Sequence, residues 1–315
     1  SLGLGKAASD GVRVYRYTSI PLRFAEGNVK IKARSGYIAY EGNVKDGYAE
    51  GYGNLYSKDS NLIYSGEFGH GRYNGTGTLF YADGQTQYEG EFADNCFQGT
   101  GILYRLNGSK EYEGDFLNGC KEGQGSLFDS GDNIIFTGAF HCDGLVYSQF
   151  LAKKTSEIGN IYTGSSRIYS NDADTLVYME DIQAMYRIDQ MQTSVEDEPV
   201  ISQVYVLNSE LIYGQTVISS LDDLTKVMGE PEFQGNTYIT LPEAVAVELI
   251  NQKGNPLNID TQLETAAVYD EVQTVKSYRT MSEIYLYVYQ TDDLIYTFFC
   301  EDRNAPFFMY MIEQV

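Results

Sequence analysis

The chain has 315 residues, a formal net charge of −22 at pH 7, 28 tyrosines, 32 glycines and no tryptophan. Apolar residues make up 43%, which indicates a folded protein with a buried core and excludes a disordered chain. The acidic body repels phosphate groups, so the composition argues against nucleic acid as a partner. Tyrosine is typical of half-buried strands, and its abundance favours a mainly β fold.

Positive charge is concentrated at the start of the chain. Residues 1–36 hold seven Lys or Arg against two Asp or Glu, residues 37–150 hold six against sixteen, and residues 151–315 hold nine against twenty-six. We expect residues 1–36 to form a basic arm whose strands, at Val12–Tyr17 and Val29–Arg34, cap the structure that follows. The arm suggests contact with a membrane surface, and a solvated strand edge is the simpler interpretation.

A 24-residue repeat occupies the next part of the chain. The tripeptide Tyr88-Glu89-Gly90 recurs without a slip in register, and a Gly-x-Gly stands eleven residues after the aromatic residue of each full unit. Recurrence at a fixed spacing predicts an array of similar structural modules. The units begin at Tyr40, Tyr64, Tyr88, Tyr112 and, in a degenerate form, Phe136.

Each unit predicts a β-hairpin. In the third unit YEGEF forms the first strand, GTGILY the second, and Asn107-Gly108 the turn that follows. Glycine in the middle of a strand leaves its backbone uncovered, so we expect the repeated aromatic rings to lie against it. One hairpin cannot bury such a face alone, whereas stacked hairpins can.

This pattern resembles the MORN repeat, a β-hairpin module that reads Tyr-x-Gly-x-(aromatic)-x₂-Gly-x₃-Gly-x-Gly. The resemblance covers residues 37–150, with four full units, a degenerate fifth unit and a weaker sixth at Tyr162-Thr163-Gly164. Phenylalanine replaces the frequent tryptophan of the family, and Asn95 stands where other units have glycine. The resemblance implies an elongated, twisted antiparallel sheet that serves protein contacts, membrane-proximal scaffolding or dimerisation, and it does not imply catalysis.

After the repeats, residues 151–315 predict an α+β domain, so the whole chain is expected to be a β-hairpin solenoid followed by this domain. Capping residues and helical spacing predict helices at 173–188, 219–229 and 242–251. Strands are expected at 200–207 and 210–213, and as a meander at 268–278, 284–289, 294–299 and 307–312. The helix and the Gly229-Glu230-Pro231 that follows it faintly resemble small bacterial lipoprotein domains of the outer-membrane-assembly type.

No catalytic or metal-binding pattern stands out. Only two histidines are present, His70 and His141, and no Gly-x-Ser-x-Gly, P-loop lysine or His-x-x-x-His occurs. The cysteines lack the spacing of a metal site. Cys96 and Cys120 occupy equivalent positions two strands apart, too far for a disulfide. We therefore expect no catalytic residue, no metal, no cofactor and four free thiols.

The candidate binding residues lie on the sheet face opposite the tyrosines and glycines. An aromatic ladder edged with carboxylates suits a peptide, a basic partner or a sugar. The alternative is that the rings merely end the second strands or are covered by the C-terminal domain. The residues of this predicted site are Tyr56, Phe80, Tyr104, Phe128, Glu67 and Glu91.

These observations favour a non-catalytic scaffold or protein-interaction protein, next to a membrane in a bacterium, with homodimerisation as a second hypothesis. A module that binds a peptide or a carbohydrate stays open as an alternative, as does a carboxylate-dependent hydrolase in residues 151–315. For location we expect a membrane-anchored or extracytoplasmic protein whose anchor precedes the sequence given, with a cytoplasmic scaffold as the rival.

Overall fold

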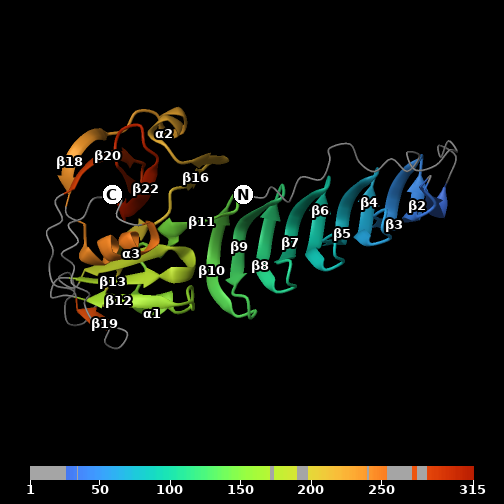
Figure 1. Cartoon of the computed structure of the whole chain (residues 1–315), viewed down its shortest axis with the longest axis horizontal. Helices are drawn as coiled ribbons and strands as arrows, with labels where there is room; N and C mark the ends of the chain where they lie inside the picture. The colour runs from blue at the N-terminus through green and yellow to red at the C-terminus, as the bar shows by residue number, and fades with distance from the viewer. Residues whose placement is uncertain are drawn as a thin grey trace. The chain divides into compact units, whose positions relative to one another are not determined.

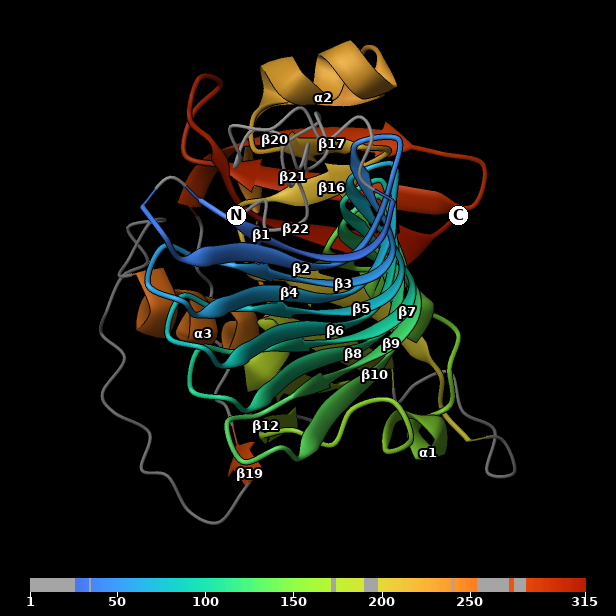
Figure 2. The same cartoon turned by 90° about the vertical axis from the view of Figure 1, so that its right-hand side faces the viewer.

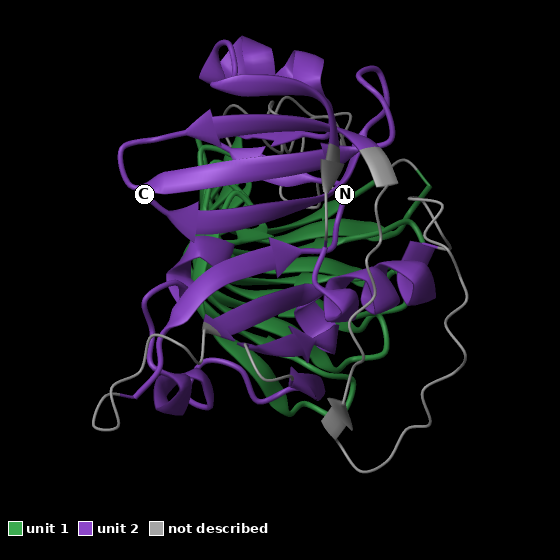
Figure 3. Cartoon of the chain, turned by 90° about the vertical axis from the view of Figure 1, so that its left-hand side faces the viewer, with its two compact units in different colours: residues 1–145 green, residues 146–315 purple. Residues whose placement is uncertain are grey.

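The computed structural model divides the chain into two compact units, residues 1–145 and 146–315 (Figures 1 and 3). The domain limits predicted from the sequence are a separate matter and remain predictions. The strand predicted at Val12–Tyr17 lies outside the described part of the chain. The structure describes residues 26–33, 35–170, 174–189, 198–239, 241–253, 272–274 and 282–315.

The first unit is a single antiparallel sheet of 11 strands that follow one another in chain order. Figure 2 shows these strands side by side, each strongly bent. The predicted array of consecutive hairpins is confirmed, and the sheet does not close on itself. The strands are β1 (Gly27–Lys32), β2 (Ile38–Lys45), β3 (Tyr48–Tyr56), β4 (Leu62–Gly69), β5 (Arg72–Phe80), β6 (Thr86–Ala93), β7 (Cys96–Tyr104), β8 (Lys110–Leu117), β9 (Cys120–Phe128), β10 (Ile134–His141) and β11 (Gly144–Leu145).

Two kinds of turn alternate along the array. The turns within repeats, such as Asp94-Asn95 between β6 and β7, have positive φ at both central residues, the geometry that matches the twist of a hairpin. The longer turns between repeats have a single positive φ, as at Gly108. Asn95, with φ of 71°, takes the place of a glycine as the sequence predicted, because asparagine tolerates left-handed backbone.

One glycine from each strand between β2 and β10 forms a continuous row across the sheet. The rings of the repeat tyrosines lie over this row, and each hydroxyl donates to a carbonyl three residues on, as Tyr64 does to Glu67 at 2.8 Å. The expected aromatic–glycine contact is confirmed. The paired glycines are Gly42, Gly53, Gly66, Gly77, Gly90, Gly101, Gly114, Gly125 and Gly138.

The core of the array is a chain of aromatic rings that runs through every repeat. Phe92 lies edge-on to the tyrosine of its own repeat, Tyr88, at 5.0 Å between centroids and to Tyr64 of the preceding repeat at 5.2 Å. Such edge-to-face pairs stabilise a fold beyond the area they bury. Because each phenylalanine bridges two repeats, the hairpins depend on their neighbours for a core.

The second unit is built on a nine-stranded sheet, in the order β18-β20-β21-β22-β15-β14-β13-β12-β19, with a separate hairpin β16-β17. Its strands confirm a mainly β chain that ends in an α+β region. They are β12 (Ser166–Ser170), β13 (Asp174–Met179), β14 (Ala184–Asp189), β15 (Ile201–Val206), β16 (Leu211–Tyr213), β17 (Thr216–Ile218), β18 (Phe233–Ile239), β19 (Val272–Thr274), β20 (Ser282–Gln290), β21 (Leu294–Cys300) and β22 (Phe307–Gln314).

Two of the three predicted helices are confirmed. Helix α2 (Leu221–Met228) begins at Ser220, whose Oγ accepts a hydrogen bond from the amide of Asp223, and ends at Gly229 with φ of 82°. Helix α3 (Glu243–Lys253) packs on one face of the nine-stranded sheet. The short segments are α1 (Thr155–Ile158), η3 (Tyr147–Phe150) and η4 (Glu180–Ile182). No helix among the described residues is long and apolar enough to cross a membrane.

The helix predicted at 173–188 is wrong. The segment forms the antiparallel pair β13 and β14, joined by η4 and by Gln183 with φ of 51°. The four consecutive residues from Leu176 to Met179 are all buried, so both faces of β13 are covered. A strand that is buried on both faces has apolar residues at nearly every position. Some of these residues then fall by coincidence at the spacing expected for one face of a helix.

Two strand pairings also differ from expectation. The strands predicted at 200–207 and 210–213 exist as β15 and β16, but β15 pairs with β14 and β22 whereas β16 pairs with β17. The last three strands of the predicted meander, β20 to β22, pair as expected. The first is wrong, because β19 pairs in parallel with β12 at the other edge of the sheet. The rest of segment 268–278 lies outside the described residues.

The weak sixth unit keeps the local geometry of the repeat. The hydroxyl of Tyr162 donates to the carbonyl of Ser165 at 2.6 Å, as the repeat tyrosines do. The carboxylate of Asp181 approaches Gly164 and accepts a hydrogen bond from the same hydroxyl at 2.8 Å. A carboxylate therefore stands where a glycine strand would lie, which explains why the array does not continue from here.

Candidate functional site

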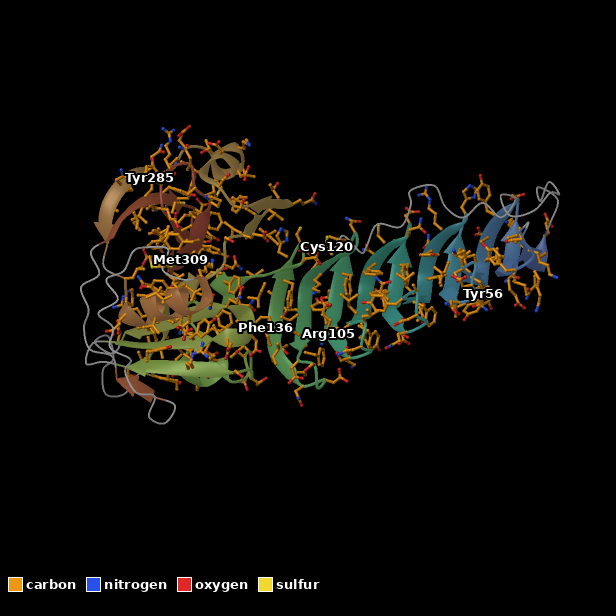
Figure 4. The ribbon with its side chains drawn as sticks, viewed as in Figure 1. Tyr56, Arg105, Cys120, Phe136, Tyr285 and Met309 are labelled. Carbon is orange, nitrogen blue, oxygen red and sulfur yellow. The ribbon has the colours of Figure 1, made fainter. Side chains whose placement is uncertain are left out.

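The predicted aromatic ladder lies at one end of the second strand of each repeat. Tyr56, Phe80 and Tyr104 are partly exposed, whereas Phe128 is only 6% exposed. Figure 4 shows Tyr56 and Arg105 at one edge of the sheet and Cys120 at the other. Three of the four rings are therefore available to solvent in this unit.

The ring of Phe128 is covered by a lysine of the chain itself. The Nζ atom of Lys110 lies 5.3 Å from the centre of the ring and 2.8 Å from Oε2 of Glu113. Lys110 also stands opposite Tyr104 in the strand register. An ammonium held between an aromatic face and a carboxylate gains from both interactions.

A second lysine occupies the first repeat in a related way. Lys30 on β1 stands opposite Glu41 on β2, with 2.8 Å between Nζ and Oε1. The hydrogen bond and the charge of Glu41 raise the pKa of Lys30, and the nearby Tyr56 adds to the effect. Lys30 thus pairs with a carboxylate across the strands, as Lys110 pairs with Glu113 beside the ring of Phe128.

The third repeat has the ring and the carboxylate, with Thr86 at the position that corresponds to Lys110. Burial and the negative charge of Glu89 raise the pKa of Tyr104, and the charge of Lys110 lowers it, so Glu89 and Lys110 both lie near this ring. Glu89 is exposed and makes no ion pair or side-chain hydrogen bond within the described chain. Tyr104 and Glu89 are therefore the ring and acid that can receive an ammonium group from elsewhere.

Two of the predicted site acids serve the fold of the array. Oε1 of Glu67 accepts a hydrogen bond from the amide of Thr76 at 3.3 Å, and Oε1 of Glu91 accepts one from the amide of Thr100 at 3.1 Å. Both amides follow a glycine with positive φ at a bulge in the sheet. The structure thus gives these carboxylates the role of satisfying backbone groups that the bulge releases.

The second unit contains a cavity of about 470 Å³ between its sheet and the start of α3. Arg187 in the cavity wall donates from Nη2 to Asp174 at 2.9 Å and from Nη1 to Gln203 at 3.1 Å. The Nε atom of Arg187 is buried without a hydrogen-bond partner among the described residues. Burial raises the pKa of the neighbouring Tyr205 to about 12. Apolar side chains complete the wall, among them Leu176, Leu241, Leu286, Phe299 and Met311.

A third group of chemically active side chains gathers where β9 meets the turn after β10. One ligand atom each from Glu122, His141 and Cys142 lie within 4.8 Å of one another. Nδ1 of His141 is 2.9 Å from Oε1 of Glu122, and Nε2 is 3.8 Å from Sγ of Cys142. Burial, with the charges of Asp143 and its neighbours, raises the pKa of the adjoining Cys120 thiol to about 11.

The repeat pattern agrees with a known family model. The model of the MORN repeat matches residues 40–61, 64–86, 88–110 and 112–133. These four matches coincide with the four full hairpin units of the sheet. Residues 40–133 therefore carry four MORN repeats. None of the curated proteins compared with it gives a significant match.

The MORN array extends beyond the matched residues in structure. Strand β10 carries the degenerate fifth unit, and its Gly138 pairs with Gly125 in the glycine row. The predicted site residues have different roles in the array. Glu67 and Glu91 accept hydrogen bonds from backbone amides at the bulges. The ring of Phe128 is covered by Lys110, whereas the ring of Tyr104 is partly exposed to solvent. The sequence did not predict that Lys30 and Lys110 pair with acids of the ladder, although Glu41, Glu89 and Glu113 occupy the same repeat position.

The sequence predicted no metal site at His141, and the structure places Glu122 and Cys142 beside its ring. The sequence distance of 19 residues between Glu122 and His141 hides their contact, because the β9–β10 pairing alone brings them together. The residues of the cavity were also missed. Arg187 lies inside the segment predicted as a helix, so its position opposite Gln203 on the next strand could not be predicted.

Proposed function

We propose that this MORN repeat protein is a non-catalytic interaction protein whose array binds lysine side chains of a basic partner protein. The observation that carries the proposal is the ammonium of Lys110, held between the ring of Phe128 and the carboxylate of Glu113. The same ring and acid recur 24 residues earlier as Tyr104 and Glu89. A partner lysine there completes a pattern that the chain itself uses elsewhere.

Charge supports a basic partner. Residues 37–150 hold sixteen Asp or Glu against six Lys or Arg, so the array attracts cationic segments over several ångströms. A carboxylate ladder repels a second acidic chain and a phosphate-rich surface. An extended segment suits the array better than a globular one, because the repeat spacing presents similar positions along a line.

The expected affinity is modest. An exposed cation–π contact contributes about 0.5–1 kcal/mol and an exposed ion pair about 0–1 kcal/mol. One lysine at Tyr104 and Glu89 therefore gives weak binding, and a useful affinity requires several contacts on one partner. Such binding is sensitive to salt, since the contributing charges are exposed.

Fluorescence anisotropy with a labelled, extended lysine-rich peptide tests the proposal. We expect binding that weakens as salt rises and that is lost when the lysines are acetylated, because acetylation removes the charge. Glu89→Gln and Tyr104→Ala should each weaken binding about five-fold, the equivalent of about 1 kcal/mol. The change Asp59→Asn removes the same charge as Glu89→Gln at the exposed turn between β3 and β4, in another repeat from Tyr104, and is the matched control.

Equal binding of the acetylated peptide contradicts the proposal, since the ammonium would then have no part in recognition. A loss of affinity in Asp59→Asn as large as that in Glu89→Gln also contradicts it, because the effect would reflect net charge alone. Circular dichroism of each variant checks that the array keeps its fold.

The absence of catalysis is part of the proposal. The MORN repeat family is generally non-catalytic, and the array residues described above serve packing and surface charge. The hydrolase alternative requires the cavity of the second unit, whose wall holds Asp174 and Glu243. Asp174 is already engaged by Arg187, which favours a structural role for this acid. Turnover in a hydrolase screen that is lost in Asp174→Asn would overturn the non-catalytic proposal.

The cavity supports a second candidate function, the binding of a small ligand by the second unit. The buried Nε of Arg187 favours a ligand with a hydrogen-bond acceptor, and the aliphatic wall favours an apolar body beside it. Thermal-shift screening with small carboxylates and amides tests this function. Arg187→Gln should abolish a stabilising hit, and a hit that survives in that variant would place the ligand elsewhere.

Location and self-association stay predictions. The seven Lys or Arg in residues 1–36 support a position next to an anionic membrane of a bacterium, and co-sedimentation with vesicles of anionic lipid tests it. Among the described strands β1 pairs only with β2, and this open outer edge supports a homodimer. Light scattering at high and low protein concentration tests the dimer, which a single monomeric mass at both would contradict.

A further inference from the structure

The last repeat differs from the others in the side chains around its turn. Across the repeats the turn position of Cys142 is otherwise Asp46, His70, Asp94 or Asn118, residue types that tolerate positive φ. Cys142 has φ of 47°, which a cysteine adopts less readily. The final turn thus places a thiol in a costly backbone conformation, beside an imidazole and a carboxylate.

The distances in this group match those of a metal site. A tetrahedral zinc ion has bonds of about 2.0–2.3 Å to nitrogen and sulfur, which puts two of its ligand atoms about 3.6 Å apart. Nε2 of His141 and Sγ of Cys142 are 3.8 Å apart. These two atoms can therefore share a metal with little movement of either side chain.

Glu122 stands where an orienting carboxylate is expected. Its Oε1 is 2.9 Å from Nδ1 of His141, and its Oε2 accepts a hydrogen bond from the amide of Cys142 at 3.0 Å. Metal-binding histidines commonly donate their second ring N–H to a carboxylate, which fixes the ring and its tautomer. With Nε2 on a metal, Nδ1 carries the proton and donates it to Glu122.

We propose that His141 and Cys142 bind a zinc-class divalent cation, and that Glu122 positions His141. Imidazole and thiolate ligands select zinc or cobalt over calcium and magnesium. One sulfur and one nitrogen leave the other positions for water. Binding releases the thiol proton, so affinity rises with pH.

Neighbouring groups agree with this assignment. Oδ1 of Asp143 accepts a hydrogen bond from the amide of Lys121 at 2.8 Å, so that carboxylate serves the turn. The ammonium of Lys121 binds Glu111 at 2.7 Å and lies over the ring of Tyr112, which keeps its charge engaged away from the ligand atoms.

Cobalt(II) is the probe that tests the site in the full chain. After treatment with a chelator, titration with Co²⁺ should give a thiolate-to-cobalt charge-transfer band that saturates at one ion per chain, and Zn²⁺ should displace it. Cys142→Ser and His141→Ala should abolish the saturable band. Glu122→Gln should keep the band and weaken affinity about 10–100-fold, as expected for a positioning residue.

Cys96→Ser is the matched control, since Cys96 is a partly exposed thiol like Cys142, at the start of another strand of the array and without a histidine at the adjoining turn. It should leave the titration unchanged. Absence of a charge-transfer band, a band that survives in Cys142→Ser, or a loss in Cys96→Ser equal to that in Cys142→Ser would each overturn the proposal. Circular dichroism confirms that the variants are folded before each titration.

Discussion

The ring of Tyr64 occupies the space in which a side chain at Gly77 would begin: a β-carbon built there would lie 2.5 Å from Cζ of the ring. The two residues are thirteen positions apart in sequence and belong to neighbouring strands of one hairpin, β4 and β5. The same relationship joins Tyr40 to Gly53, Tyr88 to Gly101 and Tyr112 to Gly125. Burial raises the pKa of each of these tyrosines.

Replacing Gly77 by alanine should destabilise the protein by about 3 kcal/mol, the upper part of the usual range for an overpacked site. The ring of Tyr64 cannot retreat, because it is stacked 3.9 Å from Tyr73 and packed edge-on to Phe68 and Phe92. Urea unfolding followed by circular dichroism measures the change.

Gly159→Ala is the control for this substitution. A β-carbon at Gly159 meets nothing within 4 Å, and the φ of −59° suits alanine. We expect less than about 0.5 kcal/mol of change for this variant. If the two substitutions prove equally harmless, the ring of Tyr64 does not require a bare backbone.

Asn95 gives a second prediction, which separates backbone strain from hydrogen bonding. Its Oδ1 accepts from the amide of Tyr73 at 2.8 Å, and its φ is 71°. Asn95→Gly keeps the backbone relaxed and loses the bond, at about 1 kcal/mol. Asn95→Ala loses the bond and adds strain of about 1 kcal/mol, so it should be the less stable variant in thermal unfolding. Equal stability of the two variants would show that the positive φ at position 95 does not strain an alanine there.

The array could be predicted from the sequence because one physical constraint repeats in every unit. A tyrosine that lies over glycine backbone fixes the residue type on two strands at once, so Tyr88, Gly90 and Gly101 all appear at the repeat interval. The bulges could not be predicted. Glu91 looked like a surface acid, and only the structure gives its hydrogen bond to the amide of Thr100.

Prediction failed where the interactions are distant in sequence and do not repeat. Both faces of β13 are buried, one of them against α3, so its local pattern could not distinguish strand from helix. One strand pairing at the end of the array brings together Glu122, His141 and Cys142. Their spacing in the sequence does not predict this contact. The two lysines near the ladder, Lys30 and Lys110, do not occupy equivalent repeat positions, so the 24-residue period did not reveal them.

The buried carboxylate of Glu248 provides a prediction for the second unit. This side chain has no exposed surface and receives two hydrogen bonds from Arg167, Nε to Oε1 at 2.7 Å and Nη2 to Oε2 at 2.8 Å, and one from the hydroxyl of Tyr169. It joins α3 to β12. Arg167→Met should cost about 3–5 kcal/mol, because the carboxylate stays buried without its charge partner.

Two further variants test this explanation. Glu180→Gln removes the other carboxylate that Arg167 contacts, at 3.1 Å and mostly exposed, and should change stability by less than about 1 kcal/mol. The double variant Arg167→Met with Glu248→Leu removes the buried charge and should recover most of the loss in urea unfolding. A double variant less stable than Arg167→Met alone would show that the cost lies in lost packing of α3.

Asp129 gives a pH-dependent prediction for the array. Its carboxylate accepts hydrogen bonds from the side chain of Asn133 at 3.0 Å, from the amide of Asn133 at 2.8 Å and from the amide of Gly131 at 2.8 Å. The side chain of Asn133, its amide and then that of Gly131 lower the pKa of Asp129 below its ordinary value of 3.8. The carboxylate therefore loses its proton more readily in the folded turn than in the unfolded chain.

A lowered pKa in the folded state stabilises the protein above the ordinary pKa, and this contribution disappears as pH falls through the folded value. Asp129→Asn should thus be less stable than the parent protein at pH 7, and the difference should shrink below pH 3.8. Urea unfolding of both proteins over this range gives the difference directly. Asp59→Asn, whose carboxylate makes no hydrogen bond within the described residues, should show no such trend. A difference between Asp129→Asn and the parent that stays constant from pH 7 to pH 3 would show that the three hydrogen bonds do not favour the ionised carboxylate.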